Sequence, residues 1–489
     1  MTISKRQLMI INIGYCYIPI FLFLCGWCRL LLSIPFCILL LLMFYQYYCV
    51  ISKQEGGANL VIGNKVLFSV VGVSAVLALI LGYGGVFVDI ASFSDYIRNG
   101  AVVQDLARYS WPVIYEDAKT PSMLTYYLGS YLLPGLIGKI IGSPVVGEIM
   151  MGLIGWIGML LIFLNILFLV DAQTSRMQLL AVVIYLGFYG MLIPLQLLTF
   201  WFNDDVILGY PYWFTYPTLQ YRSTMVCLKW VWPQYTIPIL GMIGLYSHSK
   251  FHNLYAIWIL PALICGAWAF VALVVYAVCE YVVICVRKKI VYVDIVSWQN
   301  VICVLLGMVM LAYLLGCWSS DRTGDMKIAL VTDWKYYALS YWPFCLFMFG
   351  IYFLLIWKES KKDDFFYITL FLLSVIPFMH AGKYNDWVMG VSMPALFMLA
   401  IYVIRFLLNK EVKEKTRKKW IALILFLMIS VPYPLLELYS FSFKYTGMPE
   451  RSMRDFSCIG CEDIPLEWRT YFTNYDYKES FFYKYIARR

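Results

Sequence analysis

A group of acidic and basic residues follows directly on an apolar run early in the chain. The run 66–88 is followed by Asp89, Asp95, Arg98 and Asp105. If this segment is helical, Asp95 lies three residues before Arg98 and Arg98 seven before Asp105, spacings that bring side chains onto one helix face. A carboxylate at the interface can take a proton from a hydroxyl group, and a nearby guanidinium can bind a phosphate. The plainer alternative is a solvated amphipathic helix at the membrane surface.

Two of these carboxylates compete for the role of catalytic base. Asp89 lies at the end of the apolar run, where partial loss of water would raise its pKa and favour proton abstraction. Asp95 lies one turn before Arg98, which favours the ionised carboxylate, and this pair could meet a donor phosphate or a divalent metal. Ser94 can cap the helix and place Asp95 in its first turn, where the helix dipole favours the charge. On this reasoning both carboxylates stay candidates.

Further polar residues lie at the ends of apolar runs that we place on the same face of the membrane. The segment 201–223 is rich in aromatic rings, which suit the packing of sugar rings or a prenyl chain but equally suit an interfacial belt. We expect substrate to be bound by the polar residues of these segments, namely Arg98, Asp105, Asp204, Asp205, Arg222, Lys229, Gln234, Lys383, Asn385 and Asp386. Lys229 is close enough to the outer boundary of its span to snorkel instead.

The composition is that of a polytopic membrane protein. Of the 489 residues 62% are hydrophobic and 14% charged, against roughly a quarter charged in soluble domains. The formal charge of +9 comes with basic clusters in short loops at 287–289, 358–362 and 409–419, which favour the cytoplasmic side of a bilayer. We therefore expect membrane lipids around the chain and no nucleic-acid partner.

Counting apolar runs between these basic loops predicts an all-α polytopic membrane protein with about 13 transmembrane helices. Residues 1–65 are expected to form a transmembrane hairpin and a cytoplasmic linker, 66–438 a bundle with a large outer loop at 89–144, and 439–489 an extracytoplasmic tail. The N-terminus is then cytoplasmic.

The number of membrane crossings that follow this outer loop decides its extent. Three crossings between it and the segment 201–223 would put the latter on the wrong side, so one apolar run is not a span. The short run 126–142, interrupted by Pro134 and Gly135, is the best candidate, and we predict a second interfacial helix there. The run 256–286 is too long for one helix and is predicted to break near Pro261 or Gly266.

Signatures of common soluble enzymes are missing. The chain has no phosphate-binding glycine loop, no dinucleotide-binding pattern, no zinc-protease helix and no nucleophile elbow. The 14 cysteines lie mostly inside apolar runs, with Cys458 and Cys461 as the exception. We interpret that pair as a loop disulfide or two free thiols rather than half a zinc site.

Three stretches resemble an uncharacterised bacterial family of large polytopic membrane proteins, similar in layout to the GT-C class of integral-membrane glycosyltransferases. They are SDYIRNGAVVQDLARYSWPVIY followed by YYLGSYLLPGLIGKIIG, then KYNDWVMGVSMPALFML, and the terminal SFFYKYIAR. In GT-C enzymes an acid of the first outer loop serves as base or metal ligand. The resemblance places that acid at Asp95, or else at Asp89. The sequence departs from the family pattern at Arg98-Asn99-Gly100, where Lys-His-Asn is usual, and at Gly390, where Arg is usual.

The resemblance implies a GT-C-like glycosyltransferase in the bacterial cytoplasmic membrane. It would move a sugar from a polyprenyl-phosphate-linked donor to a cell-envelope glycan or lipid acceptor on the extracytoplasmic face. No cofactor is required by this chemistry, a divalent cation such as Mg²⁺ or Mn²⁺ stays open, and we assign no metal ligands.

Two other classes stay open. A transporter or flippase of lipid-linked saccharide should place ionisable residues in mid-span, whereas the charges here lie mostly at span ends. A membrane-bound acyltransferase could use His380 as a base, but it would need a histidine deep in the bundle, and His380 is expected at an outer turn.

Overall fold

The computed structural model describes residues 2–53, 59–80, 94–116, 118, 120–191, 219, 221–291, 293–316, 329–330, 341–381, 385–439, 459 and 472–488. Helices dominate them, and eight of these helices are long and apolar enough to cross a membrane, with five shorter apolar helices of 10–17 residues beside them. The expected class, an all-helical membrane protein, is confirmed. The count of about 13 spans stays a prediction.

The long apolar helices are α1 (Lys5–Trp27), α2 (Leu30–Ser52), α6 (Pro144–Leu169), α12 (Ala267–Lys288), α13 (Trp298–Leu315), α18 (Asp386–Leu408) and two composite ones. The first composite helix joins α15 (Trp342–Cys345), the π-helical η4 (Leu346–Gly350) and α16 (Ile351–Ser360). The second joins α20 (Arg417–Ser430) and α21 (Pro432–Tyr439).

The shorter helices are α3 (Asn64–Ile80), α4 (Ser94–Arg108), α5 (Gly129–Ile141), α7 (Ser175–Gly187), α9 (Thr224–Trp230), α10 (Trp232–Ser247), α11 (Tyr255–Cys265), α17 (Asp364–Val375) and α19 (Lys410–Lys415). Single turns are η1 (His252–Leu254), η2 (Val293–Ile295), η5 (Ile376–Phe378), η8 (Tyr477–Glu479) and η9 (Phe482–Ile486). Three small antiparallel sheets are β1–β2 (Thr2–Ser4, Asn59–Val61), β3–β4–β7 (Ile114–Tyr115, Ser122–Leu124, Thr473–Asn474) and β5–β6 (Ala329–Leu330, Met379–His380).

Local signals explain where several helices begin and end. Before α1, Ser4 Oγ accepts a hydrogen bond from the Gln7 N–H at 3.2 Å, and Gln7 Oε1 accepts one from the Ser4 N–H at 3.1 Å, which forms a capping box. Asp363 caps α17 in a similar way. The break expected near Pro261 or Gly266 lies at Gly266, which ends α11 and precedes α12.

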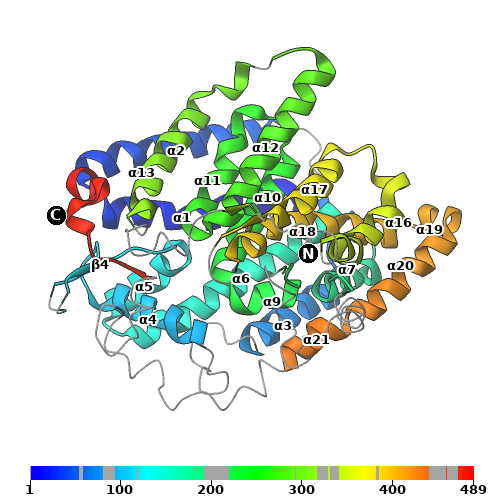
Figure 1. The fold of residues 1–489 in the computed structure, drawn as a ribbon, viewed down its shortest axis with the longest axis horizontal. Helices are drawn as coiled ribbons and strands as arrows, with labels where there is room; N and C mark the ends of the chain where they lie inside the picture. Colours follow the sequence, from blue (N-terminus) through cyan, green and yellow to red (C-terminus); the bar gives the residue numbers. More distant parts are fainter. Residues whose placement is uncertain are drawn as a thin grey trace.

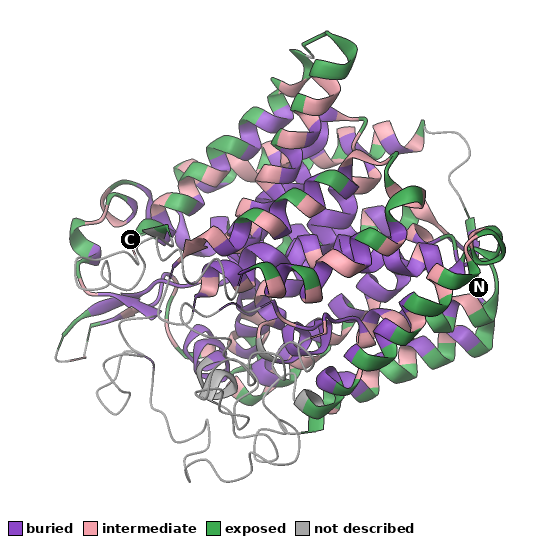
Figure 2. Ribbon diagram, turned by 45° about the vertical axis from the view of Figure 1, so that its right-hand side comes forward, coloured by how far each residue is buried: buried purple, intermediate pink, exposed green. Residues whose placement is uncertain are grey.

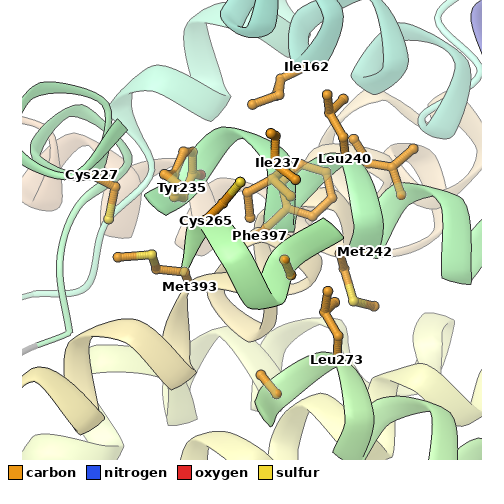
Figure 3. Close-up of a cluster of buried hydrophobic side chains, with 14 of the residues drawn as sticks. Ile162, Cys227, Tyr235, Ile237, Leu240, Met242, Cys265, Leu273, Met393 and Phe397 are labelled. Carbon is orange, nitrogen blue, oxygen red and sulfur yellow. The ribbon is translucent and has the colours of Figure 1, made fainter. Parts of the chain in front are cut away.

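Helix α18 is the centre of the bundle. Of its most apolar stretch 89% is buried, against 22% for α2, which therefore lies at the periphery. Figure 2 shows the buried residues concentrated in the middle of the molecule, with exposed apolar residues on the outer helices. Figure 3 shows part of the core, in which side chains come from α6, α9, α10, α11, α12 and α18. The exposed apolar rows suit contact with lipid tails.

Charged residues connect helices at one end of the bundle, called the basic end below. Arg405 of α18 donates to Tyr246 OH of α10 at 2.6 Å, and this hydroxyl donates to Asp363 Oδ2 at 2.7 Å. Arg287 at the end of α12 pairs with Asp364 at 2.7 Å. The ends of four helices meet here, as the positions of the basic loops predict.

The opposite end, called the α4 end below, carries the three-stranded sheet and the C-terminal segment (residues 472–488). Strand β4 lies between β3 and β7. Arg29, in the turn between α1 and α2, donates to Ala487 O at 3.1 Å, so the C-terminal segment lies against that turn. In Figure 1 the C-terminus lies at the left beside β4 and α5, and α19 and α20 lie at the right.

Candidate functional site at the α4 end

Only part of the predicted site lies in the described residues. Asp89, Asp204, Asp205 and Lys383 lie outside them, as do Cys458 and Cys461. Asp95 and Arg98 belong to the start of α4, and only their place in the helix is described. The helix predicted after Ser94 is present.

Glycines bring α4 close to its two neighbours. A Cβ at Gly135 of α5 would lie 2.4 Å from Leu106 Cβ, and one at Gly147 of α6 would lie 2.9 Å from Val103 Cγ1. Residues from Asn99 to Leu106 are buried. A solvated surface helix is therefore wrong for this part of α4, because it packs into the bundle.

Hydrogen bonds connect α4, α5 and α10 in a polar junction. Tyr131 OH of α5 donates to Asn99 Oδ1 of α4 at 2.9 Å. The neighbouring Ser130 hydroxyl donates to Pro233 O of α10 at 2.6 Å. Asp95 precedes Asn99 by one helical turn. Neighbouring residues of α5 thus bind both α4 and the start of α10, which carries Gln234.

Aromatic rings surround this junction. Gln234 Nε2 donates to Tyr126 OH at 3.2 Å. The Tyr126 ring lies 5.2 Å from Tyr127, 6.2 Å from Tyr131 and 4.2 Å from Phe472 of the C-terminal segment, between ring centroids. Amide and phenol groups beside aromatic faces are the groups that bind sugar hydroxyls and pack against sugar rings.

The break at Gly266 lets α12 approach the same junction. A Cβ on Gly266 would lie 2.8 Å from Gln234 O, so the close approach needs a glycine. Two residues later, Trp268 packs edge to face on Trp387 of α18, with centroids 5.6 Å apart. A Cβ on Gly390 would lie 2.5 Å from Trp268 Cβ. A longer side chain has no room at this position.

Asn385 and Asp386 lie at the start of α18. Asn385 is buried with a φ of 52°, and its Oδ1 accepts a hydrogen bond from the Ala381 N–H at 3.4 Å. Asn tolerates this left-handed conformation better than most residues. Its described contact therefore stabilises the turn, while Asp386 is half-buried in the first helical turn.

Arg222 lies just before α9, and Lys229 lies in the last turn of this helix. The Ser223 hydroxyl accepts a hydrogen bond from the Val226 N–H at 3.2 Å and caps the helix. Arg222 is half-buried, and Lys229 is only 2% exposed. Helix α9 packs on α10, α7 and α21. Lys229 is therefore enclosed by protein rather than extended to the surface, as snorkelling would require.

Asp105 contacts a different part of the α4 end. Its Oδ2 accepts hydrogen bonds from Tyr115 OH at 2.6 Å and from the Ile459 N–H at 2.8 Å. Burial raises the pKa of this carboxyl to about 7, against the bonds from Tyr115 and Ile459, which lower it. In the described structure Asp105 thus joins α4 to β3 and to the chain near its C-terminus.

A second buried polar pair was not expected from the sequence. Gln104 Nε2 of α4 donates to Glu148 Oε1 of α6 at 2.6 Å, and both residues are buried. The available signal was a single glutamate within the apolar run 145–170. The residues of the polar junction on α5 were also missed, because Tyr131 and Ser130 look like ordinary helix residues.

Neither protein-family models, nor curated proteins, nor solved structures match this chain. Among the described residues no group of three or more His, Cys, Asp or Glu side chains could hold a metal ion. The functional argument therefore depends on the chemistry of the residues themselves.

Proposed function

We propose that the protein is a membrane glycosyltransferase of GT-C-like organisation. It moves a sugar from a polyprenyl-phosphate-linked donor to a cell-envelope glycan or lipid acceptor at the α4 end, on the extracytoplasmic face of the bacterial membrane. The observation that carries the proposal is the polar junction of α4, α5 and α10. Through Tyr131, it connects the helix that begins with Ser94 and Asp95 to a group of aromatic rings and to the half-buried amide of Gln234.

In this proposal Asp95 takes the proton of the acceptor hydroxyl. The acceptor oxygen bonds to the anomeric carbon, and the bond between that carbon and the phosphate oxygen breaks. Polyprenyl phosphate leaves with the electron pair, and its charge is met by the cationic residues Arg98, Arg222 and Lys229. Attraction between a cationic side chain and a phosphate is stronger where protein excludes water, and Lys229 is buried.

The test is transfer of a labelled sugar. Purified protein is mixed with polyprenyl-phosphate-linked labelled sugars and an extract of membrane acceptors, and label in glycan or acceptor lipid is counted. We expect covalent transfer that needs the protein. Recovery of all label in the unchanged donor, with every donor sugar tried, contradicts the proposal.

A flippase of lipid-linked saccharide is the second candidate. It is favoured by Glu280 of α12, a carboxyl only 5% exposed within an apolar helix, as intramembrane ionisable residues often mark transport paths. Movement of labelled donor across vesicle membranes without transfer would select it. The acyltransferase alternative has less support, since His380 is half-buried on the two-residue strand β6.

A further inference from the structure

Three cysteines lie together at the turn between α1 and α2. Cys25 and Cys28 belong to the sequence Cys-Gly-Trp-Cys, which ends α1, and Cys37 lies in α2. The sulfur atoms of Cys25 and Cys37 are 4.0 Å apart. Cys28 is close enough to interact electrostatically with both. We call these residues the turn thiols.

Cys25 and Cys28 lie at the end of α1 beside polar groups of the C-terminal segment, and Cys37 lies about two turns into α2. Arg488 donates from Nη1 to Cys25 O at 3.2 Å, and its N–H donates to Trp27 O at 2.8 Å. Arg29 donates to Lys484 O at 2.6 Å. The C-terminal segment therefore contacts residues of the turn that come before and after Cys28 in the chain.

Exposure differs among the three thiols. Cys25 is exposed, Cys37 is partly buried and Cys28 is buried. Cys25 is therefore the most accessible of the three thiols. Cys37 is the next thiol within contact distance, whereas Cys28 lies beneath the docked C-terminal segment, in a backbone bridge with Ala487.

We propose that Cys25 and Cys37 form a disulfide that joins α1 to α2 beside the C-terminal segment. The Cys25 thiolate attacks a disulfide of a small molecule or of an oxidised dithiol protein, which forms a mixed disulfide and releases one thiolate. The Cys37 thiolate then attacks the Cys25 sulfur and releases the second. The protein loses two protons and two electrons, and the disulfide that was attacked is reduced to two thiols.

This disulfide has a structural consequence at the α4 end. It ties the exposed helix α2 to α1 at the surface where Arg29 binds Ala487 of the C-terminal segment and Arg488 of that segment binds the Cys25 carbonyl. Phe472 of that segment touches the Tyr126 ring. Oxidation thus stabilises the surface of α1 and α2 that binds the C-terminal segment, which in turn holds Phe472 against the Tyr126 ring. The proposal does not depend on the reaction that the protein catalyses.

The test is direct detection of the bond. Cells are quenched in acid, free thiols are alkylated, and the purified protein is digested with and without reduction for mass spectrometry. A parallel sample of purified protein is incubated with oxidised glutathione before alkylation. We expect a linked pair of peptides containing Cys25 and Cys37, which reduction separates.

Four variants make the result specific. Cys25→Ser and Cys37→Ser should each remove the linked peptides and lower the melting temperature of the oxidised protein by a few degrees. Cys28→Ser should keep the linkage, and Cys279→Ser in α12 is a control for the loss of any thiol. Alkylation of both Cys25 and Cys37 in all samples, or linkage of Cys25 to Cys28 instead, overturns the proposal.

Discussion

Hydrogen-bond partners separate the roles of the polar side chains at the α4 end. Asp105 and Asn385 bond to groups of the protein itself, Tyr115 and the Ile459 N–H in one case and the Ala381 N–H in the other. Gln234 also bonds to the protein, but its partner is the phenol group of Tyr126, which stands in the aromatic group at the polar junction. Of the residues predicted to bind substrate, Gln234 is thus the described one with surroundings best suited to a sugar.

The buried carboxyl of Asp105 makes stability depend on pH. Its pKa is raised from 3.8 to about 7 in the folded protein, so the folded state holds its proton where the unfolded state has lost it. Its contribution to stability is full below about pH 4 and is lost as the pH rises to about 7. Asp105→Asn removes this dependence and keeps an oxygen for both hydrogen bonds.

As the pH rises from 4 to 7, we therefore expect the free energy of unfolding of Asp105→Asn to increase relative to that of the wild type, by up to about 1.4 kcal/mol per pH unit. Thermal unfolding in detergent at several pH values measures the difference. Glu116→Gln changes an exposed neighbouring acid and serves as the control. Parallel profiles of the wild type and Asp105→Asn would show that the carboxyl is ionised throughout.

The sequence indicated polar residues at the α4 end but not their partners. Asp105 was singled out because it shares a helix face with Arg98, yet its bond to Ile459 spans most of the chain and has no local signal. Tyr131 and Ser130 carry no charge and no motif. Contacts of this kind are set by tertiary packing, which one sequence does not reveal.

Helix packing at the α4 end depends on close contacts at glycines. Gly135 lies against Leu106, and Gly138 would place a Cβ 3.1 Å from Ala107 Cβ. Small residues let helix backbones approach closely, which is a main source of helix association in membranes. The position of α4, and with it Asp95, therefore depends on these glycines.

Gly135→Ala is expected to push α5 away from α4 and to destabilise the protein by about 1–3 kcal/mol, as overpacking does. A lower melting temperature in detergent measures this, together with weaker sugar transfer. Gly14→Ala in α1 is the matched control, because nothing lies within 4 Å of its added methyl group. Equal melting temperatures of the two variants would refute the packing argument.

Long apolar helices and the break at Gly266 could be predicted, because length, hydropathy and glycine are local signals. The sheet β3–β4–β7 could not. Its strands have two or three residues each, and Leu124 pairs with Thr473 from the other end of the chain. Short strands with distant partners leave no periodic pattern.

At the scale of the whole molecule, the two ends of the bundle should face opposite sides of the membrane. Helix α6 has 26 residues and begins beside α4, while Arg405 of the basic end binds its Leu169 carbonyl. Its length of about 39 Å suffices to cross the hydrocarbon layer. Basic loops favour the cytoplasm, so the α4 end should lie outside.

Cysteine substitutions at exposed residues test this arrangement. A membrane-impermeant maleimide added to intact cells should modify Ser110→Cys at the α4 end and leave Thr174→Cys, beyond the end of α6, unmodified until the membrane is opened. Mass spectrometry of the modified peptide separates the new thiol from native ones. Modification of both residues from one side would contradict the topology.

The most direct measurement of the central claim is sugar transfer by Asp95→Asn and Asp89→Asn beside the wild type. The substitution keeps the size of the side chain and removes its charge, so expression and membrane insertion should not change. If Asp95 is the base, Asp95→Asn should lower turnover by about a hundredfold or more while Asp89→Asn keeps most of it. Loss of activity in Asp89→Asn alone would move the role to Asp89. Full transfer by both variants would show that the segment before α4 and the start of α4 are not catalytic, and would contradict the account.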